Sequence, residues 1–248
     1  MHFSKRCLEK ILRRFPLAYA HFRDLYGAKD WEKQTFLKTI KSGWSVVEIG
    51  ANLGYFTNLF QILVGTNGHL HAFEPVPSTF QKLESSLAKG KNHCTLHNLG
   101  TGNEAGEAIF HVPFNDHAQA TMSPHDCNSW KNRDIEEVAC SVVKLDEFEP
   151  IRSLRRIDFI KIDVEGAELP SLQGAENILR KHKPLLFVEG CKAWMKSFGY
   201  NANELEAFLR AISYNEFQVV GRNLQSISSL ESFLQSKGEE DSFNFLIS

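Results

Sequence analysis

The sequence predicts an α/β fold in which a mostly parallel sheet carries helices on both faces. Three observations support this prediction. A strand, a glycine turn and a helix follow one another over residues 45–65, a second strand ends in Glu74, and a third, at 157–163, ends in Asp163. Helical segments separate these strands, as is typical of parallel sheets. Because the carboxyl ends of parallel strands meet at one edge, we expect a ligand site there.

The composition is consistent with a single domain whose net charge is close to zero. A chain of 248 residues, 42% of them hydrophobic, can bury a substantial core. Its 28 basic and 30 acidic residues give a net charge of -2. That balance does not favour binding to nucleic acid or to an anionic membrane. We therefore expect a small or neutral ligand and no nucleic-acid partner.

Cysteine usage and hydropathy predict a cytoplasmic protein. The five cysteines are widely spread and form no CxxC pair, as expected of free thiols in a reducing compartment. No apolar run approaches the roughly 20 residues that cross a bilayer, so we expect no transmembrane segment. The first residues also lack the continuous apolar core of a signal peptide.

Residues 1–43 are predicted to form a helical extension before a main domain at 44–248. The first segment is amphipathic and basic and ends at Pro16. Its short charge cluster favours a helix that covers the sheet or the mouth of the site over a membrane-surface helix. A second helical segment, from Trp31 to Ile40, leads to the first strand.

The turn after the first strand carries the strongest ligand signal. Gly50 and Gly54 flank it, so unpaired backbone N–H groups and the positive end of a helix lie at the strand's carboxyl end. Asn52 stands where a dinucleotide-binding turn has a glycine against the pyrophosphate. Glu48 can receive a ligand ammonium, directly or through water, and would repel a phosphate. A nucleoside carrying a cationic amino acid meets both conditions, which indicates S-adenosylmethionine (SAM) rather than an ordinary strand-to-helix turn.

Glu74 is the predicted ribose ligand. It follows Gly54 at about the 20-residue spacing at which an acid meets ribose hydroxyls. Taken alone, it would be interpreted as a solvated acid at a strand end. Together with the preceding turn, it favours the cofactor site.

The segment after Glu74 should contain a helix and a strand. A capping-box pattern of Ser78 and Gln81 opens the predicted helix, and Gly90 ends it. The strand is expected at about 93–99. Its carboxyl end would place Leu99, with its neighbours, beside the adenine.

Residues 101–150 depart from the strand–helix alternation. Strands at 107–112 and 138–145 flank a polar stretch at 113–134, which predicts an antiparallel insertion over the site. A histidine of this stretch can act as a general base or join a metal site. Nothing in the stretch has the spacing of a zinc module, which favours solvated histidines. The residues concerned are Asp116, His117, His125, Asp126 and Cys127.

Acidic residues gather at the ends of two later strands. Asp163 ends the strand at 157–163, and a strand at 184–190 contains Glu189 close to its end. Glu165 and Glu168 follow Asp163 in a turn, before a helix that Pro170 suits in its first turn. For each acid the alternative is that it caps backbone amides or pairs with a lysine.

The last part of the chain predicts an antiparallel end to the sheet. A helix is expected at 204–212 and strands at 217–221 and 243–247. Only residues 228–235 between the two strands have the size of a helix. The surrounding stretch, 226–241, is interpreted as merely polar.

Three segments together resemble the FkbM family of SAM-dependent methyltransferases. They run from Glu48 to Thr57, from Phe73 to Pro75 and from Ile157 to Glu168. The resemblance covers about 45–190, and its most specific part is Lys-Ile-Asp-Val-Glu-Gly-Ala-Glu, which ends at Glu168. It implies a Rossmann-like class I methyltransferase fold with a seven-stranded sheet and an antiparallel final strand. It also implies methyl transfer to a hydroxyl of a sugar, glycolipid or other natural product.

The resulting site prediction separates cofactor contacts from chemistry. Asp163 and Glu165 are the candidate catalytic residues, with Asp163 as base or acceptor anchor. A metal-free reaction is ranked ahead of one in which Asp163, Glu165 or Glu189 holds a divalent cation. The acceptor is expected to be a small molecule or glycan, and a homodimer stays open. The predicted SAM contacts are Glu48, Gly50, Asn52, Gly54, Phe56, Thr57, Glu74, Pro75 and Leu99.

Two other functions remain as alternatives. An NAD(P)-dependent oxidoreductase could use the same type of sheet, but Asn52 and Glu48 disfavour a pyrophosphate there. The other alternative is a SAM-binding protein without catalysis, for which the intact Asp163 and Glu165 give no support.

Overall fold

The computed structural model describes residues 30–87, 93–114, 119–124, 130 and 133–248. The basic amphipathic segment predicted before Pro16 lies outside these residues. So do the five polar residues of the insertion that were considered as a base or metal site. In the described part of the chain, no helix combines the length and apolarity needed to cross a membrane.

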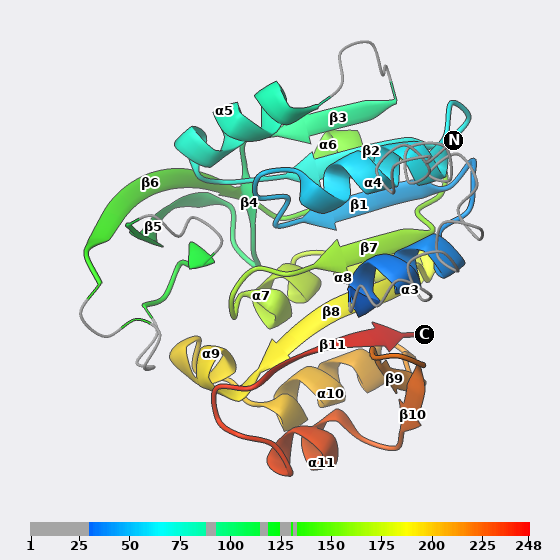
Figure 1. Ribbon diagram of the computed structural model, residues 1–248, viewed down its shortest axis with the longest axis vertical. Helices are drawn as coiled ribbons and strands as arrows, with labels where there is room; N and C mark the ends of the chain where they lie inside the picture. The colour runs from blue at the N-terminus through cyan, green and yellow to red at the C-terminus, as the bar shows by residue number, and fades with distance from the viewer. Residues whose placement is uncertain (1–29, 88–92, 115–118, 125–129, 131–132) are drawn as a thin grey trace, which may run out of the picture.

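An eight-stranded sheet forms the centre of the molecule (Figure 1). Its strands are β1 (Ser45–Ile49), β2 (His69–Phe73), β3 (Cys94–His97), β7 (Phe159–Ile162), β8 (Leu185–Cys191), β9 (Phe217–Val219), β10 (Gln225–Ile227) and β11 (Ser242–Ile247). The order is β10-β9-β11-β8-β7-β1-β2-β3. Strands β3, β2, β1, β7 and β8 pair in parallel, whereas β11 runs antiparallel to β8 and β9. The predicted mostly parallel sheet with an antiparallel final strand is confirmed.

The sheet reverses its order at β1 and gains one strand beyond the predicted seven. Ile49 of β1 lies opposite Phe73 of β2 and Ile162 of β7, so these three strands end together. Ligands of open α/β sheets bind beside such a switch point. The additional strand, β10, comes from the segment interpreted as merely polar. It pairs only with β9, at the sheet edge, where backbone hydrogen bonds do not require apolar side chains.

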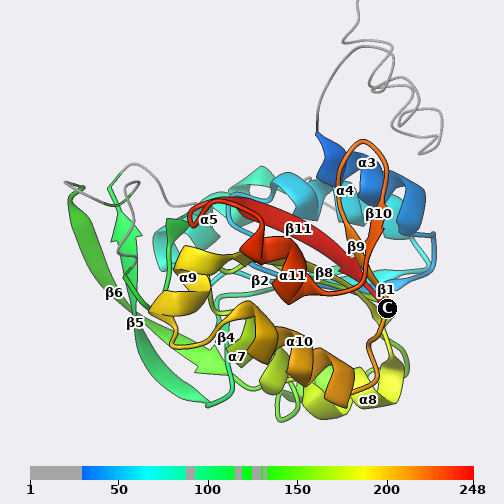
Figure 2. The same ribbon diagram turned by 90° about the horizontal axis from the view of Figure 1, so that it is seen from below.

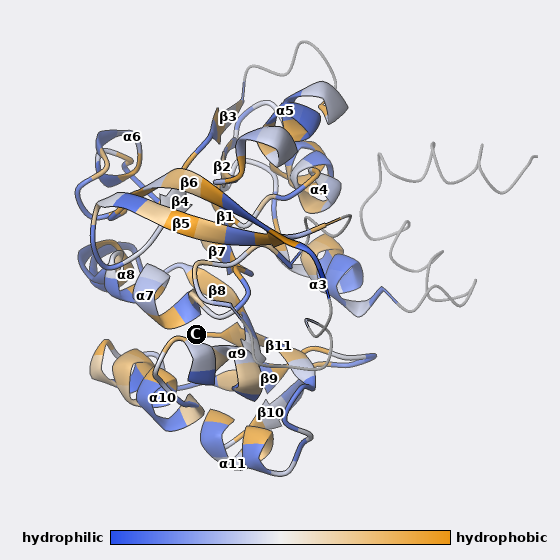
Figure 3. Cartoon of the chain, turned by 90° about the vertical axis from the view of Figure 1, so that its left-hand side faces the viewer, coloured by the Kyte–Doolittle hydropathy of each residue, from blue (hydrophilic) through white to orange (hydrophobic). Residues whose placement is uncertain are grey.

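Helices cover both faces of the sheet, with α3, α4 and α5 on one side and α7, α8 and α10 on the other (Figure 2). The helices are α3 (Trp31–Thr39), α4 (Tyr55–Val64), α5 (Pro77–Ser86), α6 (Glu149–Arg152), α7 (Glu168–Gln173), α8 (Glu176–His182), α9 (Lys192–Ser197), α10 (Ala202–Ala211) and α11 (Leu230–Gln235). Helices α10 and α11 carry both apolar and polar colours along their length (Figure 3), as expected for helices that pack on one side only.

Strand alternation divides the core into two layers. Successive side chains of a strand point to opposite faces. Phe159 of β7 therefore packs with Phe36 of α3 and Phe60 of α4, with the Phe36 and Phe159 ring centroids 5.8 Å apart. The next residue, Ile160, belongs to the cluster under the helices of the opposite face, together with Leu179. Burial on both faces explains why the central strands are almost continuously apolar.

The region after β3 forms a second, three-stranded sheet. Its strands are β4 (Gly100–Thr101), β5 (Gly106–Pro113) and β6 (Ile135–Val143), in the order β4-β6-β5. Strands β5 and β6 are antiparallel, as predicted for this region. Thr121 adds an isolated antiparallel bridge to His111 of β5. This bridge brings the segment 119–124 back toward the carboxyl edge of the main sheet.

Two local predictions need correction. Helix α5 begins at Pro77 after Val76, and no side-chain cap hydrogen bond forms there, so the capping box of Ser78 and Gln81 is wrong. Instead, Pro77 has a backbone angle φ that already suits the first turn of the helix. The helix expected after Pro170 is divided into α7 and α8 at Gly174. The capping box present in the described chain begins α10, where Asn201 and Glu204 exchange hydrogen bonds.

Candidate functional site

A cavity of about 230 Å³ opens at the carboxyl edge of the sheet, between the ends of β1, β2 and β7. It reaches the insertion as well, because Phe110, Ala120 and Met122 form part of its wall. Seven of the predicted site residues line it. They are Gly50, Asn52, Glu74, Pro75, Leu99, Asp163 and Glu165.

Four predicted cofactor contacts do not line this cavity. Gly54 instead begins α4 with a left-handed backbone (φ 84°), and Phe56 faces a separate groove near α3. The carboxylate of Glu48 is buried and accepts a 2.7 Å hydrogen bond from the Thr57 hydroxyl. Burial raises the pKa of Glu48 to about 7. Direct contact between Glu48 and a ligand ammonium stays a prediction.

The turn after β1 packs tightly against the end of β7. Gly50 has φ 82°, and a Cβ there would lie 1.9 Å from the carbonyl oxygen of Asp163. Only glycine fits this position without displacing the neighbouring strand end. Asn52 also has a left-handed backbone (φ 48°), which asparagine tolerates better than most residues. The turn therefore fixes the distance between the first strand end and Asp163.

Glu74 is held in place by two backbone amides. Its carboxylate accepts hydrogen bonds from the N–H groups of Asn52 (2.9 Å) and Val76 (3.0 Å). Burial raises the pKa of Glu74 to about 7, although these two bonds oppose the change. The buried Oδ1 of Asn52 beside it has no hydrogen-bond partner among the described residues. The cavity thus contains an anchored carboxylate and an amide oxygen suited to ligand donors.

Asp163 forms an ion pair with a buried lysine. The Nζ atom of Lys161 lies 2.9 Å from Oδ2 of Asp163, and the Lys161 side chain is only 1% exposed. Burial favours neutral Asp163, but the charge of Lys161 outweighs it and holds the Asp163 pKa below its usual value. For Lys161, burial lowers the pKa, but Asp163 and Glu48 reverse the effect and raise it. Both partners are therefore charged at neutral pH.

The pKa of Glu189 is shifted in the opposite direction. Burial, followed by the charges of Asp163 and Glu165, raises the pKa of Glu189 well above its usual value. The hydroxyl of Ser242 donates to its Oε1 atom. The pKa values of Asp163 and Glu189 are thus shifted in opposite directions, so Glu189 takes up a proton more readily than its neighbour.

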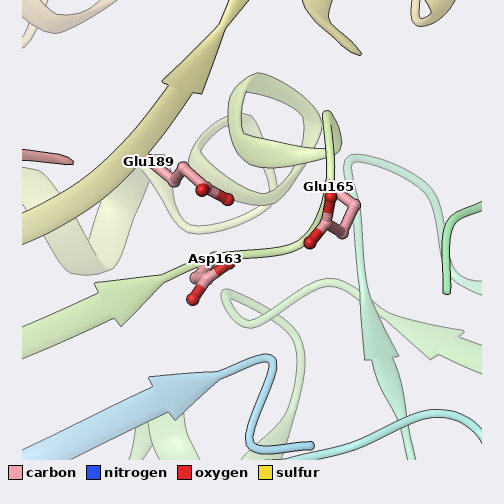
Figure 4. A group of neighbouring side chains, drawn as sticks. All are labelled: Asp163, Glu165 and Glu189. Carbon is pink, nitrogen blue, oxygen red and sulfur yellow. The ribbon is translucent and has the colours of Figure 1, made fainter. Parts of the chain in front are cut away.

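The carboxylates of Asp163, Glu165 and Glu189 converge on one point (Figure 4). One oxygen from each lies within 4.8 Å of the others, a spacing that a metal ion could bridge. Acidic groups of this kind also occur without a metal. The predicted gathering of acids is therefore present for these three residues.

Glu168 serves a different purpose from these three acids. Its Oε1 atom accepts from the backbone amides of Val164 (3.1 Å) and Gly166 (3.2 Å), and Tyr200 donates to Oε2. The carboxylate thus stabilises the turn that carries Glu165, which has a left-handed backbone (φ 54°). Here the alternative considered from the sequence, an acid that caps backbone amides, is the one observed.

Thr121 ties the insertion to the same turn. The side chain is fully buried, and its hydroxyl donates a 2.9 Å hydrogen bond to the carbonyl oxygen of Glu165. Ser123 donates in the same way to the carbonyl oxygen of Ser197 before α10. These two hydrogen bonds join the segment 119–124 to the turn that carries Glu165 and to the end of α9. Ala120 and Met122 of this segment line the cavity.

We expect Thr121→Val to lower the free energy of unfolding by about 1–3 kcal/mol, because the Glu165 carbonyl loses its buried donor. Chemical denaturation measures this change. The same substitution at the partly exposed Thr95 of β3, whose hydroxyl contacts His69, should cost less. Equal losses in the two variants would contradict the special role of Thr121.

Several functional residues were not found from the sequence. Lys161 was considered only as one partner for the acids, because nothing in a β-strand pattern shows that it is buried. Phe110 and Met122 are ordinary apolar residues of the insertion. A β-strand that alternates toward the cavity could have indicated Phe110, but no sequence signal places Met122 there.

The sequence model that describes the methyltransferase FkbM domain matches residues 48–216, more than half of the chain. The chain belongs to the FkbM methyltransferase family. Methyltransferase 1 from Beauveria bassiana (strain ARSEF 2860) is 27% identical over 146 residues, which cover 53% of this chain and 58% of that protein. The 31-O-demethyl-FK506 methyltransferase FkbM of Streptomyces tacrolimicus is 27% identical over 161 residues, covering 56% and 62%. The matches thus span about three fifths of these curated relatives.

The chain also aligns with a solved structure at low similarity. The crystal structure of methyltransferase FkbM from Methylobacillus flagellatus KT aligns with 88% of this chain and 55% of its own, at 18% identity and a TM-score of 0.49. The assignment to the class I methyltransferase fold therefore depends on the strand order and the antiparallel β11 observed in this FkbM-family chain.

SAM is the cofactor of this family, and the cavity residues fit it. A nucleoside needs hydrogen-bond partners for two ribose hydroxyls, and the amide-anchored Glu74 presents a carboxylate to the cavity. The unpartnered Oδ1 of Asn52 is an additional acceptor beside it. Pro75, Leu99 and Phe110 supply apolar walls suited to a purine.

Proposed function

We propose that the protein transfers the methyl group of SAM to a hydroxyl oxygen of a sugar, glycolipid or other natural product. The observation that carries this proposal is the continuity of one cavity. It extends from Asn52 and Glu74 to the ion-paired Asp163 and its neighbour Glu189. Residues that would bind the cofactor and a group that can accept a proton thus line the same cavity.

In this proposal Asp163 accepts the proton of the acceptor hydroxyl. When bound, SAM supplies a methyl group on a sulfonium, a leaving group that needs no acid. A hydroxyl becomes strongly acidic as its oxygen gains the methyl group, so the low pKa of Asp163 is sufficient late in the reaction. Lys161 holds the Asp163 carboxylate in one orientation. Glu165 contributes to positioning the acceptor beside it.

Glu74 is proposed to bind the ribose hydroxyls, which makes SAM affinity dependent on pH. Its pKa is about 7, and the ionised form is the better acceptor of hydroxyl protons. We expect the affinity to be constant well above pH 7 and to fall, by up to tenfold per unit, as the pH drops below 7. Isothermal titration calorimetry from pH 5.5 to 8.5 measures this profile.

Two variants test the assignment of Glu74. Glu74→Gln should remove much of the pH dependence and lower the affinity at pH 8. Glu204→Gln, at the exposed start of α10, is the control and should leave the profile unchanged. A wild-type profile that Glu74→Gln does not alter would assign the titration to another group, such as the buried Glu48.

We propose that the reaction needs no divalent metal. Lys161 already compensates the charge of Asp163, and the raised pKa of Glu189 opposes its ionisation, which reduces the need for a cation beside the three acids. Treatment with EDTA followed by dialysis should leave the rate of methyl transfer unchanged, and added Mg²⁺ should not increase it. A loss of rate that Mg²⁺ restores would instead place a cation between Asp163, Glu165 and Glu189.

The decisive experiment combines cofactor binding with product detection. Calorimetry with SAM and, separately, with NAD distinguishes a methyltransferase from an oxidoreductase. Mass spectrometry then detects a gain of one methyl group in a panel of hydroxylated sugars and glycolipids. SAM binding without a methylated product across broad acceptor panels would favour a binding protein without catalysis, and NAD binding without SAM binding would overturn the proposal.

A further inference from the structure

A second hollow lies on the α3 and α4 side of the acids. It measures about 580 Å³ and is formed by the first residues of α3 and α4 together with the beginning of β11. Figure 1 shows α3 lying over the sheet beside β8 and β11. We call it the α3 groove. Its lining includes Asp30, Trp31, Glu32, Tyr55, Ser242 and Asn244.

The α3 groove borders the catalytic acids through shared walls. Ser242, which lines the groove, donates a hydrogen bond to Glu189, which lines the cofactor cavity. Phe56 also lines the groove, and its ring centroid is 5.4 Å from the Nζ atom of Lys161. The ion pair of Lys161 and Asp163 therefore lies next to the groove wall. A ligand in the groove would lie next to Ser242 and Phe56, the residues that contact Glu189 and Lys161.

The lining combines aromatic faces with oxygen acceptors. Tyr55 is 59% exposed, although its hydroxyl is oriented by a hydrogen bond to Asp30. Glu32 is oriented by a 2.7 Å hydrogen bond from the amide of Asn244. Aromatic rings pack against the C–H face of a saturated ring, while fixed carboxyl and amide groups bind the hydroxyls at its edge.

We infer that the α3 groove binds the acceptor and that this acceptor carries a neutral, polyhydroxylated ring. The inference rests on the proposed methyl transfer and assigns its acceptor side to Trp31, Glu32 and Tyr55. Such a ring presents both an apolar face and hydroxyl groups, which match the two kinds of lining. A hydroxyl bound beside Ser242 would lie close to Asp163 and Glu189.

Charge excludes other acceptors. Asp30 and Glu32 both line the groove and their charges disfavour phosphorylated or carboxylated rings, although the Lys33 ammonium lies 5.2 Å from the Tyr55 ring centroid. Burial raises the pKa of Glu32 to about 7, with Asp163 adding to the effect. Near neutral pH this group can therefore both donate to and accept from a hydroxyl, as a neutral sugar requires.

Saturation-transfer-difference NMR on the full chain tests the inference. The probes are methyl glucoside, methyl galactoside, methyl mannoside and methyl rhamnoside, each measured with S-adenosylhomocysteine present, and glucose 6-phosphate as the charged comparison. At least one neutral glycoside should give signals at its ring C–H protons. Tyr55→Ala and Trp31→Ala should each weaken its apparent affinity about fivefold to tenfold, as expected for loss of one aromatic contact.

Controls separate this inference from the proposed function. Phe114→Ala removes a 71% exposed aromatic ring at the end of β5 and should leave glycoside binding unchanged. SAM affinity by calorimetry should stay within twofold of wild type in Tyr55→Ala, which also shows that the variant is folded. If SAM binds but no neutral glycoside does, or if both groove variants bind it as wild type does, the groove assignment is overturned and the methyltransferase proposal stands. If SAM does not bind, the proposed function itself fails.

Discussion

Asp163→Asn is expected to lower the rate constant for methyl transfer by about 10²–10⁴-fold, the usual contribution of a positioned base. The amide has nearly the same shape but cannot accept the hydroxyl proton. SAM affinity should change by only a few-fold, because the anchored Glu74 is untouched. Single-turnover kinetics with the best acceptor from the panel gives the rate, and calorimetry gives the affinity.

The matched control is Asp158→Asn, which removes an acid from the opposite end of the same strand. Asp158 accepts from the Ser45 amide and pairs with Arg156, far from the cavity lining. It should affect stability without changing the rate constant. A rate for Asp163→Asn within threefold of wild type would assign proton removal to water or to another acid, with Glu165 as the first candidate.

Lys161→Met is expected to lower the free energy of unfolding by about 3–5 kcal/mol, the typical cost of removing one partner from a buried ion pair. Methionine fills similar space, so the loss arises mainly from charge. Asp163 would remain without its cation, close to the buried Glu48 and to Glu189. Chemical denaturation should be measured at pH 8, where Asp163 is least able to relieve the loss by taking up a proton.

Two further variants test the cause of this loss. Adding Asp163→Asn to Lys161→Met should recover part of the stability, because the uncompensated carboxylate is then absent. Lys144→Met removes a partly exposed lysine that pairs with the exposed Glu147 and should cause little change. No recovery in the double variant would show that Lys161 stabilises the fold through packing, including its contact with the Phe56 ring, rather than through charge.

The two strand-end acids of the predicted cofactor site show how far sequence reasoning extends. Glu48 and Glu74 were both expected to contact the ligand. Glu74 lies one residue beyond β2, where the chain turns and the side chain faces the cavity. Glu48 lies inside β1, so its side chain must point to one face of the sheet, where Thr57 of α4 covers it. Relative to the strand end, Glu48 therefore lies two positions earlier than Glu74, inside the sheet rather than in the turn beyond it.

The acidic cluster depended on packing in a similar way. The turn after Asp163 predicted a concentration of carboxylates, and Asp163, Glu165 and Glu189 do converge. Glu168 is only three residues beyond Glu165, yet its side chain turns back to the amides of the turn. Glu32 joins this region from α3, far away in the sequence, and only the packing of that helix on the sheet brings it there.

The sequence by itself determined the order of strands and helices, the glycine turn and the family, because these depend on local periodicity and short motifs. The edge strand β10 was not predicted from the sequence, because an edge strand needs backbone partners rather than an apolar pattern. Tertiary structure decided the pKa shifts as well. Lys161 holds the pKa of Asp163 below its usual value while burial raises the pKa of Glu189, and both effects depend on distances and solvent exclusion that no linear pattern specifies.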